Sequence, residues 1–387
     1  MKRYLILSAA VVMQMCLGAT YAWSVFVLPL KSATGILQGM VQLPFSMFYF
    51  AFPATMIVTG SLLPRIGPRR CAMTGGLLFG GGWLLASLGR IDFAFTVLGI
   101  GLVAGIGVGF AYIVPIATCV RWFPRQKGLV TGVAVAGFGG GAALISHVAG
   151  AFMTHLSLSP FGVFSLLGAA FTLLVCLAGS VMENPPDTHQ VRVSLMPVGT
   201  LLKTRTFVCL YLAMVAGLAA GFAVNANMKE LYGAAGIQAG VSAVAAFALA
   251  NAAGRITWGW IFDRSRSLRV LQANLLLQAA VLMLNPLILR SESGLLIFAA
   301  LSGFNYGGIL VLYAAAAAEK WGGERLGQIY GWLFSANIVA AVSPIVAGML
   351  FDRLGSFAPA LWGIGALMLL GVAVLGADVR RKPAAGN

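Results

Sequence analysis

A single basic residue, Arg255, lies well inside an apolar stretch of the sequence, NAAGRITWGWIFDR (251–264). A guanidinium group presents a planar fork of N–H donors that matches the two oxygens of a carboxylate. All ten acidic residues of the chain fall in predicted loops or at the ends of predicted helices, so we expect no protein carboxylate near Arg255. The pattern favours an anion from outside the protein as its partner. The alternative is that Arg255 extends toward the end of its helix or bonds to helix carbonyls.

Polar and aromatic residues in other apolar stretches could shape a pocket around such an anion. Gln14 and Tyr21 are seven residues apart, which places them two turns apart on one helical face. The remaining candidates are Tyr112, Phe138, Asn251, Asn305, Tyr306, Phe334 and Asn337. A buried tyrosine usually needs a hydrogen-bond partner, so each tyrosine could instead have a structural role.

The composition defines the environment in which these residues must act. The chain has 387 residues, of which 60% are hydrophobic and only 9% charged, whereas a soluble domain carries about 25% charged residues. This excludes a soluble enzyme. Apolar stretches of about 20 residues, enough to cross a bilayer, predict an all-α membrane protein with twelve transmembrane helices. These lie near 4–30, 36–62, 70–89, 93–118, 127–153, 159–182, 206–228, 237–262, 268–289, 293–317, 326–350 and 357–378.

The depth of Arg255 follows from this assignment. It precedes Asp263, at the end of its predicted helix, by eight residues, or about 12 Å at 1.5 Å per residue. In a hydrocarbon core of about 30 Å this is close to the midplane, where a buried charge costs roughly 3 kcal/mol or more. A charge at this depth indicates a functional site.

The formal charge of +15 predicts the orientation of the chain. Of 25 Lys and Arg residues, nineteen fall on the side of the two termini and five on the opposite side, with Arg255 between them. Cytoplasmic loops hold the excess of basic residues, so we expect both termini in the cytoplasm and the chain in the plasma (inner) membrane. The charge is then a topology signal, and we expect no nucleic-acid partner.

The chain contains an internal repeat. A polar, proline-containing linker at 183–205 separates an N-terminal half, 1–182, from a C-terminal half, 206–387. RWFPRQKGLVTG (121–132) matches KWGGERLGQIYG (320–331) at an offset of 199 residues. Matched loops lie on the same side, so the two six-helix bundles are expected to be related by a pseudo-two-fold axis along the membrane normal.

Twelve predicted helices, a parallel repeat and degenerate GxxxDRxGRR motifs resemble the major facilitator superfamily (MFS). At the same offset, Gly60 and Arg65 of GSLLPR pair with Gly259 and Arg264 of GWIFDR. Glycine lets two helices approach closely, while Asp and Arg cap and bridge helix ends. The first copy has Pro64 in place of the acidic residue and the second keeps Asp263. We therefore expect an asymmetric gate in which Asp263 is the main acidic element.

A finer resemblance is to the oxalate/formate antiporter and monocarboxylate transporter branch. It rests on TYAWSVFVLPL (20–30), GIGVGFAYIVPIATCVRWFPRQKGLVTGVAVAGFGGGA (105–142), NAAGRITWGWIFDR (251–264) and GQIYGWLFSANIVAAVSPIVAGMLFDRLGS (327–356). The resemblance implies that Arg255 holds the carboxylate of the substrate and that Tyr112 and Tyr306 are pocket aromatics.

Two departures from the related transporters bear on substrate and coupling. Asn337 stands where dicarboxylate-handling oxalate transporters have a Lys, so one carboxylate, as in lactate, pyruvate or formate, is favoured over two. Asn251 stands where animal-type monocarboxylate transporters have an Asp used in proton coupling, and their Lys in the first helix is also missing. A coupled proton would then have to use Arg255 with the substrate, water or His147, although His147 could equally be a packing residue.

The sequence thus predicts a secondary active transporter of small monocarboxylates, acting as a proton-coupled symporter by alternating access and as a monomer in the lipid bilayer. The alternative is an anion exchanger of the oxalate/formate type, which needs no proton site. A membrane sensor would need an output domain, and the segment after the last predicted helix is short. We expect no enzyme activity, cofactor or metal, because no nucleophile and base pair, metal-ligand spacing or phosphate loop occurs.

The charge at position 337 gives a test. Asn337→Lys should raise the ratio of oxalate to lactate transport about tenfold, because a second charge-assisted contact is worth about 1.5 kcal/mol or more. The measurement is uptake of each labelled acid by proteoliposomes, with the neutral Asn337→Gln as control. An unchanged ratio would contradict the argument from charge.

Overall fold

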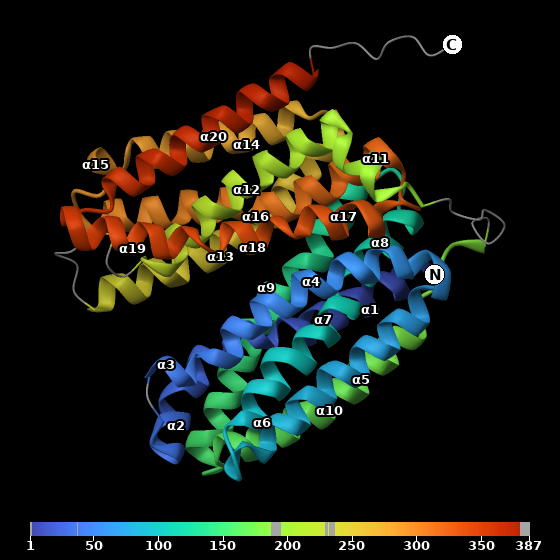
Figure 1. The fold of residues 1–387 in the computed structure, drawn as a ribbon, viewed down its shortest axis with the longest axis vertical. Helices are drawn as coiled ribbons and strands as arrows, with labels where there is room; N and C mark the ends of the chain where they lie inside the picture. Colours follow the sequence, from blue (N-terminus) through green and yellow to red (C-terminus); the bar gives the residue numbers. More distant parts are fainter. Residues whose placement is uncertain (1, 37, 187–194, 229–230, 232–236, 380–387) are drawn as a thin grey trace. The chain divides into compact units, whose positions relative to one another are not determined.

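The structure is a computed structural model, and it describes residues 2–36, 38–186, 195–228, 231 and 237–379. Over these residues it is built from helices, with no β-strand (Figure 1). The helices of the N-terminal half are α1 (Lys2–Leu17), η1 (Gly18–Ala22), α2 (Ser24–Thr34), α3 (Gln38–Val41), α4 (Leu43–Ile66), α5 (Pro68–Ala86), η2 (Ser87–Arg90), α6 (Ala94–Thr96), η3 (Val97–Ala104), α7 (Gly105–Ala111), α8 (Ile113–Trp122), α9 (Lys127–His155) and α10 (Pro160–Ser180).

The helices of the C-terminal half are α11 (Val198–Lys203), α12 (Arg205–Ala226), α13 (Ile237–Ser265), α14 (Arg269–Met283), α15 (Asn285–Ile288), α16 (Glu292–Trp321), α17 (Leu326–Phe334), α18 (Ala336–Ala340), α19 (Ser343–Leu354) and α20 (Ala358–Val379). Short helix α11 lies within the predicted linker, of which residues 187–194 are outside the described residues.

Ten helical segments in the described part of the chain are long and apolar enough to cross a membrane. The other two predicted spans coincide with α13, which has 29 residues, and α14, which has 15. Several predicted helices are interrupted, and proline gives the reason in two cases, since it removes a backbone donor and clashes with the preceding turn. Pro115 follows the break at Tyr112, and Pro286 follows the break between α14 and α15.

The helices form two compact units, each of which includes a short segment from the other half of the sequence. Unit 1 comprises Met1–Arg125, Val133–Leu195 and Trp321–Ser335. Unit 2 comprises Gln126–Gly132, Met196–Lys320 and Ala336–Asn387. Within unit 1, α5 packs along α10, and within unit 2, α14 packs along α20 (Figure 1). The predicted division of the chain into two halves, 1–182 and 206–387, stays a prediction.

Equivalent glycine contacts occur in the two units. In unit 1, a Cβ added to Gly60 of α4 would collide with the carbonyl oxygen of Gly327 in α17. In unit 2, a Cβ on Gly259 of α13 would collide with the carbonyl oxygen of Gly128 in α9. Both glycine pairs are related by the repeat offset of 199 residues. Backbone touches backbone at these points, so only glycine allows the helices to approach so closely.

The core of unit 1 contains an aromatic cluster around Trp83. The Trp83 ring is fully buried, and its centroid lies 5.3 Å from that of Phe171 and 5.5 Å from that of Phe164. Phe26 and Phe79 complete the contacts at 6.0 and 6.3 Å. No polar side chain takes part in these ring contacts.

Candidate functional site

Arg255 lies inside α13, ten residues before the end of the helix at Ser265, or about 15 Å along its axis. Its side chain is 5% exposed and is the only buried charged side chain among the described residues. The Nε atom donates a hydrogen bond of 2.9 Å to Oδ1 of Asn251, one turn earlier. This bond orients the guanidinium and gives it a neutral oxygen as partner.

Protein carboxylates are placed away from the middle of the spans. Eight of the ten acidic residues lie in the described part of the chain, in loops or within three residues of a helix end: Asp92, Glu183, Asp263, Glu292, Glu319, Glu324, Asp352 and Asp378. Arg255, ten residues from the C-terminal end of α13, lies farther from a helix end than any of these acidic residues.

Several predicted pocket residues come together in unit 1 around Tyr112. The Tyr112 ring is 2% exposed and lies 5.4 Å from the ring of Phe138 and 5.3 Å from that of Phe334. Phe52 of α4 contacts both Tyr112, at 5.1 Å, and Phe334, at 5.0 Å. The sequence reasoning missed Phe52, because a phenylalanine in an apolar stretch carries no signal that separates a pocket from a core.

Gln14 and Tyr21 extend this aromatic group. Gln14 is fully buried in α1, and its Nε2 atom donates to the backbone oxygen of Tyr112 at 3.3 Å. Tyr21 contacts Phe138 edge to face at 4.8 Å and stacks on Tyr49 at 5.7 Å. Tyr49 was not predicted as a neighbour of Tyr21, because it lies in an aromatic-rich run, 45–50.

The unit 2 candidates on α16 face in different directions. Asn305 is 3% exposed, and its backbone oxygen accepts a hydrogen bond of 2.9 Å from Nδ2 of Asn274 in α14. Tyr306 is half-buried between the rings of Phe222 and Phe247, at 6.1 and 5.9 Å. Neighbouring residues on a helix point about 100° apart, so the two cannot line one surface equally.

The predicted binding residues are thus divided between the units. Unit 1 holds Gln14, Tyr21, Tyr112, Phe138 and Phe334, and unit 2 holds Asn251, Arg255, Asn305, Tyr306 and Asn337. Asn337 is 8% exposed in α18. A pocket that combines both sets stays a prediction.

His147 was predicted as a candidate proton carrier, and the structure places it on an exposed face of α9. Its Nδ1 atom is 2.9 Å from the carbonyl oxygen of Ala143, one turn earlier. A carbonyl oxygen only accepts, so Nδ1 carries the proton of this bond. Its part in coupling stays a prediction.

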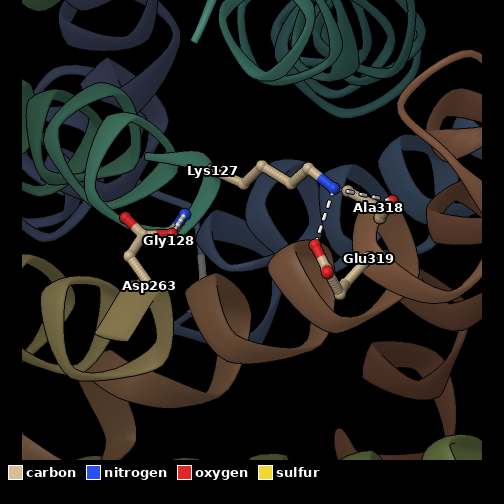
Figure 2. A network of polar contacts seen from close by, with 5 residues as sticks. All are labelled: Lys127, Gly128, Asp263, Ala318 and Glu319. Carbon is tan, nitrogen blue, oxygen red and sulfur yellow. Dashed lines mark hydrogen bonds and ion pairs between the residues drawn. The ribbon is translucent and has the colours of Figure 1, made fainter. Parts of the chain in front are cut away.

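Asp263 caps the start of α9 within unit 2 (Figure 2). Its Oδ1 atom accepts from the amide of Gly128 and its Oδ2 atom from the amide of Leu129, each at 2.7 Å. Amides in the first turn of a helix have no partner within the helix, and a carboxylate there also interacts favourably with the helix dipole. Lys127 adds an ion pair of 2.7 Å to Glu319, which sequence reasoning missed because it joins distant residues.

The equivalent position in unit 1 has no such cap. Pro64 corresponds to Asp263 by the repeat offset, and α17 begins after Arg325 without a side-chain cap. Instead, Arg121 donates from Nη2 to the backbone oxygen of Glu324 at 3.0 Å. Of the two motif arginines, Arg65 is exposed, and Arg264 lies over the Trp260 ring at 3.5 Å from its centroid.

Long apolar helices and a repeat in sequence are typical of a polytopic membrane transporter. The sequence profile of the Major Facilitator Superfamily matches residues 9–228 and 207–387, and the chain belongs to this superfamily. The family and the all-α membrane fold predicted from the sequence are confirmed.

The chain is similar to transporters of small organic anions. It is 26% identical to the oxalate:formate antiporter of Oxalobacter formigenes over 352 residues, covering 88% of this chain and 82% of that protein. It is 28% identical to monocarboxylate transporter 12 of Mus musculus over 367 residues, covering 84% and 73%. The crystal structure of the human organic anion transporter MFSD10 shares the fold, with a TM-score of 0.75 at 15% identity, covering 96% of this chain and 99% of that one.

The cap on α9 gives a prediction. Asp263→Asn leaves one uncharged acceptor oxygen for the Gly128 and Leu129 amides, which Asp263 binds with two. The lost charged hydrogen bond is worth about 1.5 kcal/mol, so exchange of these amides should accelerate about tenfold. Exchange is measured by mass spectrometry on the purified protein. Asp352→Asn, an exposed member of the similar FDR sequence in α19, is the matched control and should leave the α9 amides unchanged. Equal exchange in Asp263→Asn and wild type would contradict the cap.

Proposed function

We propose that the protein is a secondary active transporter of small monocarboxylates of the lactate, pyruvate or formate class, with Arg255 holding the substrate carboxylate. The observation that carries the proposal is the burial of this one charged side chain inside α13. The protein works by alternating access, in which two helical bundles expose a central site first to one side of the membrane and then to the other.

The energetics of Arg255 favour an anionic ligand. A positive charge in the bilayer interior costs roughly 3 kcal/mol or more, and the amide oxygen of Asn251 offsets only part of this because it is neutral. A carboxylate brings the opposite charge and two acceptor oxygens that fit the guanidinium. The bond from Nε to Asn251 keeps the guanidinium in place, which lowers the entropy lost when substrate binds.

The number of positive charges favours one carboxylate. The relatives include an oxalate:formate antiporter and a monocarboxylate transporter, so the class of small carboxylates is supported by similarity. Among these, the neutral Asn337 and the single buried Arg255 suit a substrate with one negative charge.

We favour proton symport as the mode of coupling, in which the proton uses Arg255 with the substrate carboxylate, water or His147. The protein would act as a monomer in the plasma (inner) membrane with both termini in the cytoplasm, as the distribution of basic residues indicates. Anion exchange is the second candidate, because the oxalate:formate antiporter is a similar protein.

Removal of the buried charge tests the binding site. Arg255→Gln should reduce uptake of labelled lactate, pyruvate or formate about 10- to 100-fold, since a charged hydrogen-bond partner is worth about 1.5–3 kcal/mol. Uptake is measured in proteoliposomes, with the exposed Arg290→Gln as matched control. Undiminished uptake in Arg255→Gln at equal reconstitution would exclude Arg255 as the carboxylate partner.

A proton gradient distinguishes the two modes of coupling. Liposomes without internal substrate, placed in an acidic medium, should accumulate the labelled monocarboxylate above its external concentration if a proton enters with it. A protonophore should abolish this accumulation. Uptake that occurs only when the liposomes are preloaded with a second carboxylate would establish exchange instead.

A further inference from the structure

A group of buried polar atoms in unit 2 has no protein partner. Ten buried side-chain nitrogen and oxygen atoms in the described part of the chain lack a hydrogen bond, and seven of them belong to α13, α14 and α16. One of the seven, Tyr313 Oη, lies eight residues beyond Asn305 on α16, and the other six form the group. They are Trp258 Nε1, Asn274 Oδ1, Gln278 Nε2, Gln278 Oε1, Ser302 Oγ and Asn305 Oδ1. Each side chain is at most 4% exposed.

The helix register brings these side chains together. Asn274 and Gln278 lie one turn apart on α14, and Ser302 and Asn305 lie one turn apart on α16. The bond from Asn274 Nδ2 to the Asn305 backbone oxygen, 2.9 Å, fixes the alignment of the two helices. Only short α15 and a turn join them, so they run antiparallel. Gln278 is therefore aligned with Ser302, as Asn274 is with Asn305.

Trp258 reaches the same group from α13. A Cβ added to Gly308 would lie 2.7 Å from Trp258 Cδ1 and 2.8 Å from Asn274 Nδ2, so the indole and the amide meet over this glycine. The indole Nε1 is bonded to that Cδ1 atom. Trp258 follows Arg255 by three residues, which places the polar group within one helical turn of the arginine along α13.

The mixture of donors and acceptors identifies the ligand. Trp258 Nε1 and Gln278 Nε2 can only donate, the three amide oxygens can only accept, and the Ser302 hydroxyl can do both. A cation would satisfy the oxygens and leave the donors, whereas an anion would do the reverse. Water donates and accepts, and buried water usually makes about three hydrogen bonds to such groups. Unsatisfied buried polar atoms destabilise a fold, so six of them in one place need partners.

We propose that Trp258, Asn274, Gln278, Ser302 and Asn305 bind ordered water molecules inside unit 2, beside the helix that carries Arg255. This hydration site is separate from the substrate site and does not depend on the proposed function. Trp83 in unit 1 gives the contrast, because its Nε1 atom also lacks a partner but the ring is surrounded by phenylalanine rings.

Hydroxyl-radical footprinting of the wild-type protein tests the site directly. Radicals generated from bound water by synchrotron X-rays oxidise adjacent side chains even when these are buried. Trp258 and Trp83 are both buried, at 4% and 0% exposure, so burial alone predicts little oxidation of either. The hydration site predicts that Trp258 is oxidised at least about tenfold faster than Trp83. Equal protection of the two tryptophans would overturn the proposal.

A second measurement uses Gln278→Leu. If water bonds to Gln278, the substitution removes those bonds, so Trp258 oxidation should decrease and Tm should fall by about 2 °C or more. If the group is dry, replacing an unsatisfied amide by an apolar side chain should raise Tm instead. Asn285→Leu is the control, since the buried Asn285 amide bonds directly to the Leu282 oxygen at 2.7 Å, and it should leave Trp258 oxidation unchanged.

The ionic conditions separate water from a cation. The melting temperature of the wild type should be the same in equal concentrations of sodium, potassium and choline chloride. A rise in Tm with sodium or potassium alone that is lost in Gln278→Leu would identify a cation site and overturn the assignment to water.

Discussion

The cost of placing one positive charge inside an apolar helix bundle dominates the structure around Arg255. The backbone there is held rigidly, because α13 and α16 touch backbone to backbone at Gly254, against the Phe304 oxygen, and at Gly307, against the Asn251 oxygen. Arg255 therefore projects from a seam that cannot easily shift, and Asn251 fixes its guanidinium from the same helix. A charge that is buried and held in place in this way has the preorganisation that the proposed binding of a carboxylate requires.

The repeat preserves backbone packing while the chemistry differs between the two copies. A Cβ on Gly132 would collide with the Arg255 oxygen, and a Cβ on Gly331 would lie 2.6 Å from the Met56 oxygen, so Arg255 and Met56 occupy equivalent places. One copy carries a charge and the other a fully buried apolar side chain. At the pair of Asp263 and Pro64, one copy again carries a charge and the other an uncharged residue. The duplicated scaffold therefore provides the close helix contacts, and single-copy residues provide the charge and the helix cap.

The sequence predicted those features that depend on local composition. Long apolar runs predicted the spans, and a charge within such a run predicted the burial of Arg255. The breaks at Tyr112 and after α14 were missed, although Pro115 and Pro286 signal them, because hydropathy does not register the loss of a backbone donor. Phe52 could not be predicted as a neighbour of Tyr112, since its position depends on how α4 packs and an aromatic residue in an apolar run is otherwise unremarkable.

The seam between α14 and α16 shows why polar side chains collect in one unit. By the repeat offset, Asn274 and Gln278 correspond to Gly75 and Phe79 of α5. A Cβ on Gly75 would lie 2.7 Å from the Gly107 oxygen, so α5 and α7 pack backbone against backbone there. Unit 2 places amides where unit 1 has a glycine and an apolar ring, so the helix pair that packs backbone against backbone in one copy buries polar atoms in the other. Trp258 of this group lies one turn from Arg255 along α13, so the buried polar side chains of unit 2 occur where the two copies of the repeat differ in sequence.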